Sequence, residues 1–313
     1  MSLDARIKFR HLQCFLEVAR QGSVMKAANV LAITQPAVSK TLKELEETLD
    51  VHLFDRTTRG AKLTAFGEVF LRHAGASVAA LRQGVDGIAQ VRNRGGAVVK
   101  LGALPTVSAG IIPRAIRTFK ARVTGATIHV VTGDNAVLLA ALRVGELDLV
   151  VGRLAGPEQM TTLAFEHLYT EPVRFVVRPG HPLTRETGFA LTRILEFTVL
   201  LPSEDSIIRP YVDRFLIANG IGMVPDRIET VSMPFGRRYV RSSDAIWIIS
   251  HGVVAEDIET GDLVELPFDT SITNGPVGLT TRADQHASVA VLLLMTDIRE
   301  AIDCQLKAEE TSQ

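Results

Sequence analysis

The first third of the chain places its apolar residues at the spacing of amphipathic helices. Residues three and four apart lie on one side of a helix, so this spacing gives each helix one buried face. One face of the first predicted helix carries Phe9, Leu12, Phe15, Leu16 and Ala19. From residue 65 to residue 93 the same spacing continues sparsely, which predicts a long helix that is more stable when paired with another helix.

Between these helices, two shorter ones are predicted to form a helix-turn-helix. Ser23 and Thr34 precede the two helical patterns, and serine and threonine are favoured N-caps. Pro36 falls in the first turn of the second pattern, where its missing N–H costs little. The buried stripe of that helix is Val38, Leu42, Leu45 and Leu49. A short basic turn or hairpin, residues 54–64, follows.

From Arg94 onward the pattern changes to short apolar runs that alternate with helical stretches. Such alternation predicts mostly parallel sheets covered by helices. The predicted strands are Val98–Leu104, Ile128–Val131, Leu147–Val151, Val173–Val177, Thr198–Leu201, Ile246–Ile249 and Val277–Thr280. The predicted helices include Ala109–Arg122, Ala136–Val144, Pro210–Asn219 and His286–Ile302.

Charge divides the chain in the same place. Residues 1–93 carry a net charge of +4 and residues 94–313 a net charge of −5. A basic segment favours an anionic partner, although chance also produces differences of this size. Two distant cysteines and a first decapeptide without an apolar stretch predict a cytoplasmic protein without disulfides. The longest apolar run, Val289 to Met295, is too short to predict a membrane span.

The first turns of the helix after Thr34 carry polar residues that an ordinary surface helix does not require. Gln35, Ser39, Lys40 and Lys43 lie off its buried stripe. In a helix-turn-helix these positions meet the major groove of DNA, where glutamine reads adenine and lysine contacts guanine or phosphate. Arg56, Arg59 and Lys62 follow as a basic wing suited to the DNA backbone. The alternative is a solvated face on a three-helix bundle.

The segment from "GSVMKAA" through "TQPAVSK…ELE", "LFDR" and "LTAFG" resembles the N-terminal domain of LysR-type transcriptional regulators. The resemblance implies an α+β multidomain chain: a winged helix-turn-helix, a dimerising linker helix, and an α/β effector domain of two subdomains like periplasmic binding proteins. The implied boundaries are 1–64, 65–94, 95–168 with 270–304, 169–269, and a tail at 305–313. The family's DNA-reading positions fall on Gln35, Pro36, Ser39 and Lys40, with Arg56 and Arg59 in the wing.

Three segments after predicted strands are candidates for an effector cleft, because exposed N–H groups at helix starts favour anions. They contribute Pro105, Thr106, Ser108, Thr132, Asp134, Pro202 and Ser203. Helix capping is the alternative role for each hydroxyl and for Asp134. Arg237, one helical turn before Arg241, is a further candidate as a carboxylate clamp. It suits a solvated or subunit-contact face equally well.

The segments "LGALPTVSAGIIPRAI" and "FGRRYVRSSDAIWIISHGVVAED" resemble the branch of the family that contains the regulator of the pca operon for protocatechuate catabolism, with its sugar-responsive relatives. This implies a transcriptional activator in a homo-tetramer that binds double-stranded DNA, a small acidic effector and RNA polymerase. The effector is expected to be a carboxymuconate or its lactone, with a sugar or sugar acid as the alternative. Enzymatic function is not expected, since the sequence lacks GxSxG, GxGxxG, P-loop and HExxH motifs. A solute-binding protein, a bound cofactor and a metal site are not expected either.

Overall fold

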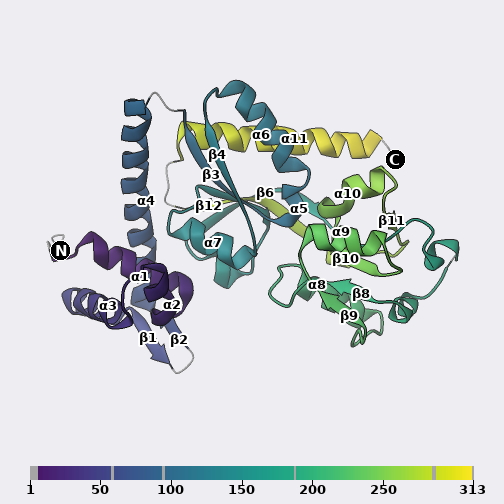
Figure 1. Cartoon of the computed structure of the whole chain (residues 1–313), viewed down its shortest axis with the longest axis horizontal. Helices are drawn as coiled ribbons and strands as arrows, with labels where there is room; N and C mark the ends of the chain where they lie inside the picture. The colour runs from purple at the N-terminus through teal and green to yellow at the C-terminus, as the bar shows by residue number, and fades with distance from the viewer. Residues whose placement is uncertain (1–5, 58–59, 94–95, 187, 284–286, 312–313) are drawn as a thin grey trace.

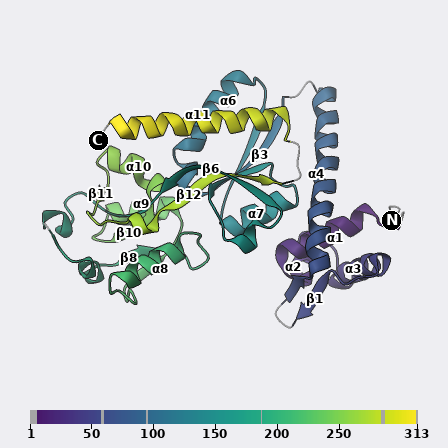
Figure 2. The ribbon, with the colours of Figure 1, turned by 180° about the vertical axis from the view of Figure 1, so that it is seen from behind.

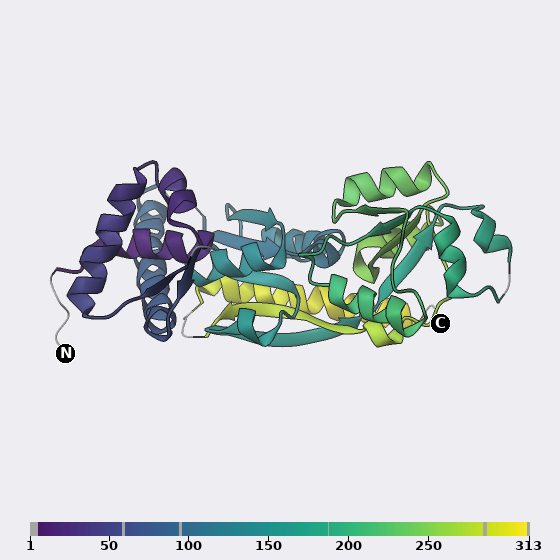
Figure 3. The ribbon, with the colours of Figure 1, turned by 90° about the horizontal axis from the view of Figure 1, so that it is seen from below.

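The computed structural model describes residues 6–57, 60–93, 96–186, 188–283 and 287–311. It is an elongated molecule with a small helical head at one end and two sheet-containing subdomains beyond it (Figures 1 and 3). The head consists of α1 (Phe9–Gln21), α2 (Val24–Val30), α3 (Gln35–Leu49), β1 (Phe54–Thr57), β2 (Gly60–Leu63) and the first part of α4 (Ala65–Asn93).

Local chemistry explains the head. The side chain of Ser23 accepts a hydrogen bond from the N–H of Lys26, and Thr34 accepts one from Ala37. These are the two predicted N-caps, and they start α2 and α3. The apolar stripes of α1, α3 and α4 then meet in one core that includes Phe15, Val38, Leu42, Leu45 and Leu71. The predicted long helix is present as α4, which extends away from the head (Figure 1).

Subdomain I contains a five-stranded sheet in the order β4-β3-β5-β12-β6. Its strands are β3 (Val98–Ala103), β4 (Thr127–Thr132), β5 (Leu149–Arg153), β6 (Leu163–Glu171) and β12 (Gly275–Arg282). Helices α6 (Ile111–Arg122) and α11 (Val289–Thr311) pack on one face, and α7 (Asn135–Arg143) packs on the other. The short helix α5 (Pro105–Ser108) and the 3-10 turn η1 (Pro157–Met160) complete this subdomain.

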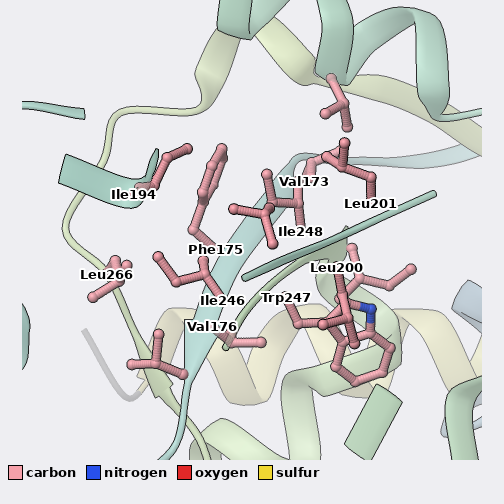
Figure 4. Packing of buried hydrophobic residues seen from close by; sticks show 14 of the residues in the cluster. Val173, Phe175, Val176, Ile194, Leu200, Leu201, Ile246, Trp247, Ile248 and Leu266 are labelled. Atoms are coloured by element: carbon pink, nitrogen blue, oxygen red, sulfur yellow. The ribbon is translucent and has the colours of Figure 1, made fainter. Parts of the chain in front are cut away.

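Subdomain II has a second five-stranded sheet, in the order β11-β7-β10-β8-β9. Its strands are β7 (Val173–Val177), β8 (Val199–Leu201), β9 (Arg227–Glu229), β10 (Ile246–Ser250) and β11 (Val264–Glu265). Its helices are α8 (Arg209–Ala218), α9 (Met233–Arg241) and α10 (His251–Glu259), with 3-10 turns η2 (Pro182–Arg185), η3 (Leu191–Glu196) and η4 (Ser271–Thr273). Figure 4 shows the side chains packed around this sheet, among them the fully buried Trp247.

All seven predicted strands are present, but the prediction of mostly parallel sheets is wrong. Strands β3, β4 and β5 are parallel, as are β8, β9 and β10, whereas β12 pairs antiparallel with both β5 and β6. Strand β7 is likewise antiparallel to β10 and β11. The reversed strands, β7 and β12, are the first strands after the two chain crossings between the subdomains.

Two boundaries differ from the expected ones. Strand β6 continues to Glu171, so the first crossing lies at Pro172 and not after residue 168. The tail predicted at 305–313 is wrong over its described part, because α11 continues to Thr311. Ile302 is buried against α6 and Leu306 is partly buried in the same cluster, which keeps this end of α11 in contact with subdomain I.

Candidate nucleic-acid interface and effector cleft

The first turns of α3 present polar side chains to solvent. Gln35, Pro36, Lys40 and Lys43 are exposed, and Ser39 is partly exposed. Val38, Leu42 and Leu45, on the opposite face, are 2% exposed or less. Helix α3 is therefore held rigidly by its apolar face while its N-terminal polar face remains open to a partner.

The predicted wing is a two-stranded antiparallel hairpin. Strand β1 pairs with β2, with Asp55 opposite Lys62 and Arg56 opposite Ala61. Lys62 is exposed. The side chain of Arg56 and the whole of Arg59 lie outside the described residues.

The predicted effector residues lie at strand ends in both subdomains. Pro105, Thr106 and Ser108 form α5, directly after β3, while Thr132 ends β4 and Asp134 is the N-cap residue of α7. These two strands are parallel neighbours, so the two groups share one edge of the sheet. Pro202 and Ser203 follow β8 in subdomain II. Thr132 and Asp134 are exposed, whereas Pro202 is buried.

Thr106 has a partner within the chain. Its hydroxyl donates a hydrogen bond to the carboxylate of Glu171, which also accepts one from the N–H of Gly252 at 3.1 Å. Glu171 ends β6 and Gly252 is the second residue of α10, so the carboxylate joins the two subdomains at their first crossing. Burial raises the pKa of Glu171, and the hydrogen bond from Thr106 and the charge of Arg153 oppose that rise.

Arg153 lies at the same place, where the chain crosses between the subdomains, and we call this place the hinge. Its Nη2 donates to the carbonyl of Glu171 at 2.7 Å, and its Nη1 donates to that of Thr273 at 3.1 Å. The guanidinium thus joins the two crossing segments, and it lies 5.1 Å from the ring centre of Tyr211 in α8. The side chain is 2% exposed, and burial lowers its pKa.

The predicted arginine clamp faces into subdomain II. Arg237 Nε donates to Asp257 Oδ2 at 2.8 Å and its Nη2 donates to the carbonyl of Val253 at 2.5 Å. Arg241 contacts the other oxygen of Asp257 at 2.6 Å and also pairs with Asp262. The two guanidinium groups therefore share a carboxylate of the chain itself, and this explains why they lie one turn apart.

A hollow of about 300 Å³ lies between α5 and α6 on one side and α10 on the other. It brings together two of the predicted residues, Thr106 and Arg237, with Arg114 and His251. Thr132, Asp134, Pro202 and Ser203 do not line it.

The sequence analysis missed Glu171 and Arg153, and it did not name Asn135 as a site residue although Asn135 ends the candidate segment that contains Thr132 and Asp134. Asn135 is buried at the start of α7, and its Nδ2 has no hydrogen-bond partner in the described structure. Its place directly after "TGD" was an available signal. Nothing in the sequence marks Glu171 or Arg153, since each interacts with residues far away along the chain.

None of the helices in the described ranges combines the length and the hydropathy of a membrane span. Two family models match the chain. Residues 9–68 match the bacterial regulatory helix-turn-helix protein, lysR family, and residues 92–303 match the LysR substrate binding domain.

Individual relatives match over almost the whole length. The HTH-type transcriptional regulator PcaQ of Agrobacterium fabrum is 56% identical over 299 residues, 96% of each chain. YdcI of Escherichia coli, an uncharacterized HTH-type transcriptional regulator, is 37% identical over 95% of this chain and 96% of its own. A full-length OxyR structure from Pseudomonas aeruginosa has the same fold, with a TM-score of 0.60 at 23% identity over 94% of this chain and 95% of its own. The chain belongs to the LysR family of bacterial transcriptional regulators.

Proposed function

We propose that this regulator binds promoter DNA through α3 and activates genes of aromatic catabolism when a small carboxylate occupies its effector domain. The 56% identity to PcaQ over 96% of both chains is the observation that carries this proposal. The head supports the DNA-binding part, because its exposed polar turn and its basic wing lie on adjoining elements.

In the proposed complex the first turns of α3 enter the major groove. Gln35 reads a base edge, Pro36 and Ser39 approach the backbone or a base, and Lys40 and Lys43 contact guanine or phosphate. Arg56 and Arg59 of the wing grip the flanking phosphates. The exposure of Gln35, Lys40 and Lys43 supports these roles.

The proposed effector is a muconate carrying three carboxylates, or the lactone derived from it. It binds between the subdomains, near Pro105, Thr106, Ser108, Thr132 and the N-cap residue Asp134, with Pro202 and Ser203 opposite. The N-terminus of α7 favours an anion through its N–H groups. The Nδ2 of Asn135 is an additional buried donor at that place. Arg237 enters the proposal only as part of the hollow beside α5, because Asp257 already binds its guanidinium.

Assembly into a tetramer of two dimers, and contact with RNA polymerase, are also part of the proposal. Support for dimerisation comes from α4, where Leu81, Val85 and Ile88 are 57%, 65% and 70% exposed. Their spacing places them on one face of the helix. Three large apolar side chains on one exposed helix face favour pairing with a second copy.

A thermal-shift panel tests the effector. We expect 3-carboxy-cis,cis-muconate or its lactone to raise the melting temperature, because a ligand at a hundredfold excess over its Kd stabilises the native state by about 2.7 kcal/mol. Citrate, which also carries three carboxylates, is the matched control and should give a smaller shift. Stabilisation by a neutral sugar without stabilisation by either acid would contradict the carboxylate effector.

A further inference from the structure

The turn that follows α7 contacts the DNA-binding head. Val144, the residue after α7, belongs to the same apolar cluster as Leu71, Ala74 and Val78 of α4, and it is 6% exposed. Helix α4 meets the end of α7 in both ribbon views (Figures 1 and 2). A residue of subdomain I thus completes the core of the head.

Gly75 permits this close approach. A Cβ at Gly75 would overlap the carbonyl oxygen of Arg143 and lie 3.7 Å from the Cα of Val144. Glycine in the middle of a helix weakens it, so a packing reason is needed for its presence. Gly84 of the same helix has nothing within 4 Å of the corresponding position, so a methyl group added there meets no neighbour.

Two more contacts extend the same interface. Gly145, with φ +72°, packs against Ala79 of α4. Arg20 of α1 donates to Glu146 at 3.2 Å, and it also binds Glu17 at 2.6 Å. The interface therefore combines apolar packing against α4 with an ion pair to α1.

Subdomain I holds this turn rigidly from the other side. Arg282 of β12 is buried, and its Nη1 donates to the carbonyl of Leu142 and, at 2.7 Å, to that of Leu147. Burial lowers the pKa of Arg282 to about 10, so the guanidinium stays charged at neutral pH. These two hydrogen bonds hold the end of α7 and the turn after it against the sheet. The head, which packs on this turn, is therefore expected to move with α7.

The other end of α7 lies at the proposed effector residues. Asp134 is its N-cap residue, and Thr132 ends the preceding strand. The helix has nine residues, about 13 Å at 1.5 Å per residue. We propose that α7 is a rigid strut between the effector cleft and the DNA-binding head, with residues 142–147 as the seat on which Gly75 of α4 docks. The cleft end of this inference rests on the proposed function.

Hydrogen exchange on the full-length protein tests the seat without knowledge of the effector. The N–H groups of residues 144–147 are bonded within the turn, to the carbonyls of Ala140, Ala141 and Leu142. We expect Gly75→Ala to speed the exchange of these amides about tenfold, because the added methyl prevents docking and the turn opens more often. Gly84→Ala adds the same methyl to the same helix and should leave them unchanged.

The strut is tested by reciprocity, since coupling between two sites acts in both directions. Binding of a generic DNA duplex at low salt should change the exchange of amides 136–139 in the wild type and in Gly84→Ala. In Gly75→Ala, DNA binding should change the exchange rates of amides 136–139 less than twofold, because the two sites are then no longer coupled.

Val144→Asp disrupts the seat from subdomain I and leaves α4 untouched. It should reproduce both effects of Gly75→Ala, whereas Ile217→Asp, at a 65% exposed position of α8, should have neither. Equal exchange rates of amides 144–147 in Gly75→Ala and Gly84→Ala would contradict the docking of Gly75 on residues 142–147. The strut would be contradicted if amides 144–147 exchange faster in Gly75→Ala while DNA binding still changes the exchange of amides 136–139 as it does in the wild type. Failure of muconate to bind affects neither result, so it rejects only the proposed effector.

Discussion

Gln35 is the single side chain most directly tied to sequence recognition. It is exposed at the first position of α3, directly after the Thr34 cap that fixes the start of the helix. We expect Gln35→Ala to lose about 1–3 kcal/mol of discrimination between the operator and a variant with a changed base pair, because a bidentate contact to a base edge contributes that much. Fluorescence anisotropy with the two duplexes measures the ratio of affinities.

Gln13→Ala is the matched control for this substitution. Gln13 is exposed on α1 and lies outside the proposed interface, so its removal should leave the ratio of affinities unchanged. An unaltered ratio in folded Gln35→Ala would remove Gln35 from the reading of bases.

At single positions, the sequence predicts well what depends on neighbours along the chain. The caps Ser23 and Thr34 could be predicted because a cap acts over three residues. The role of Arg237 could not, because its partner Asp257 lies 20 residues away and is brought close only by the packing of α9 against the sheet.

Among the elements, the hinge contains a carboxyl group that responds to pH. The pKa of Glu171 is raised above its ordinary value of 4.5, chiefly by burial. The native state therefore keeps a proton that the unfolded chain releases, and the free energy of unfolding falls as the pH rises from 4.5 through the raised pKa. Over the pH range in which only the native state holds this proton, the free energy of unfolding falls by about 1.4 kcal/mol per pH unit.

Glu171→Gln should remove this fall, since an amide at that place accepts from Gly252, donates to Thr106 and does not titrate. Urea unfolding across this pH range measures the change. Glu204→Gln, at an exposed position, is the control and should keep the slope of the wild type. Because burial also raises the pKa of Glu265 and of Asp297, part of the slope should remain in Glu171→Gln, and a slope equal to that of the wild type would show that Glu171 does not contribute.

The elements that the sequence analysis missed share a physical reason. Strand β6 is only partly buried along most of its length and has no continuous apolar run, because it lies at the edge of its sheet next to β12. The seven predicted strands include fully buried ones such as β8 and β10, which do form apolar runs. Burial on both faces made β8 and β10 recognisable, whereas the largely exposed edge strand β4 was recognised from its apolar run Ile128–Val131 alone.

For the whole molecule, the assembly depends on a helix that is largely unpaired in the single chain. Leu81, Val85 and Ile88 form an exposed apolar stripe beyond the part of α4 that packs in the head. A long helix with such a stripe is stabilised chiefly by a partner and not by its own propensity. We therefore expect Ile88→Asp to dissociate the proposed dimer, because the substitution places a charge in the middle of an apolar interface.

Light scattering coupled to size exclusion measures the mass directly, and Ile217→Asp provides the control at a position of similar exposure in subdomain II. Loss of the dimer should also weaken DNA binding strongly, because one head then contacts only one half-site. If Ile88→Asp keeps the mass of the wild type, the chains pair through another surface. In that case α4 would serve chiefly to hold the head on its seat at the end of α7.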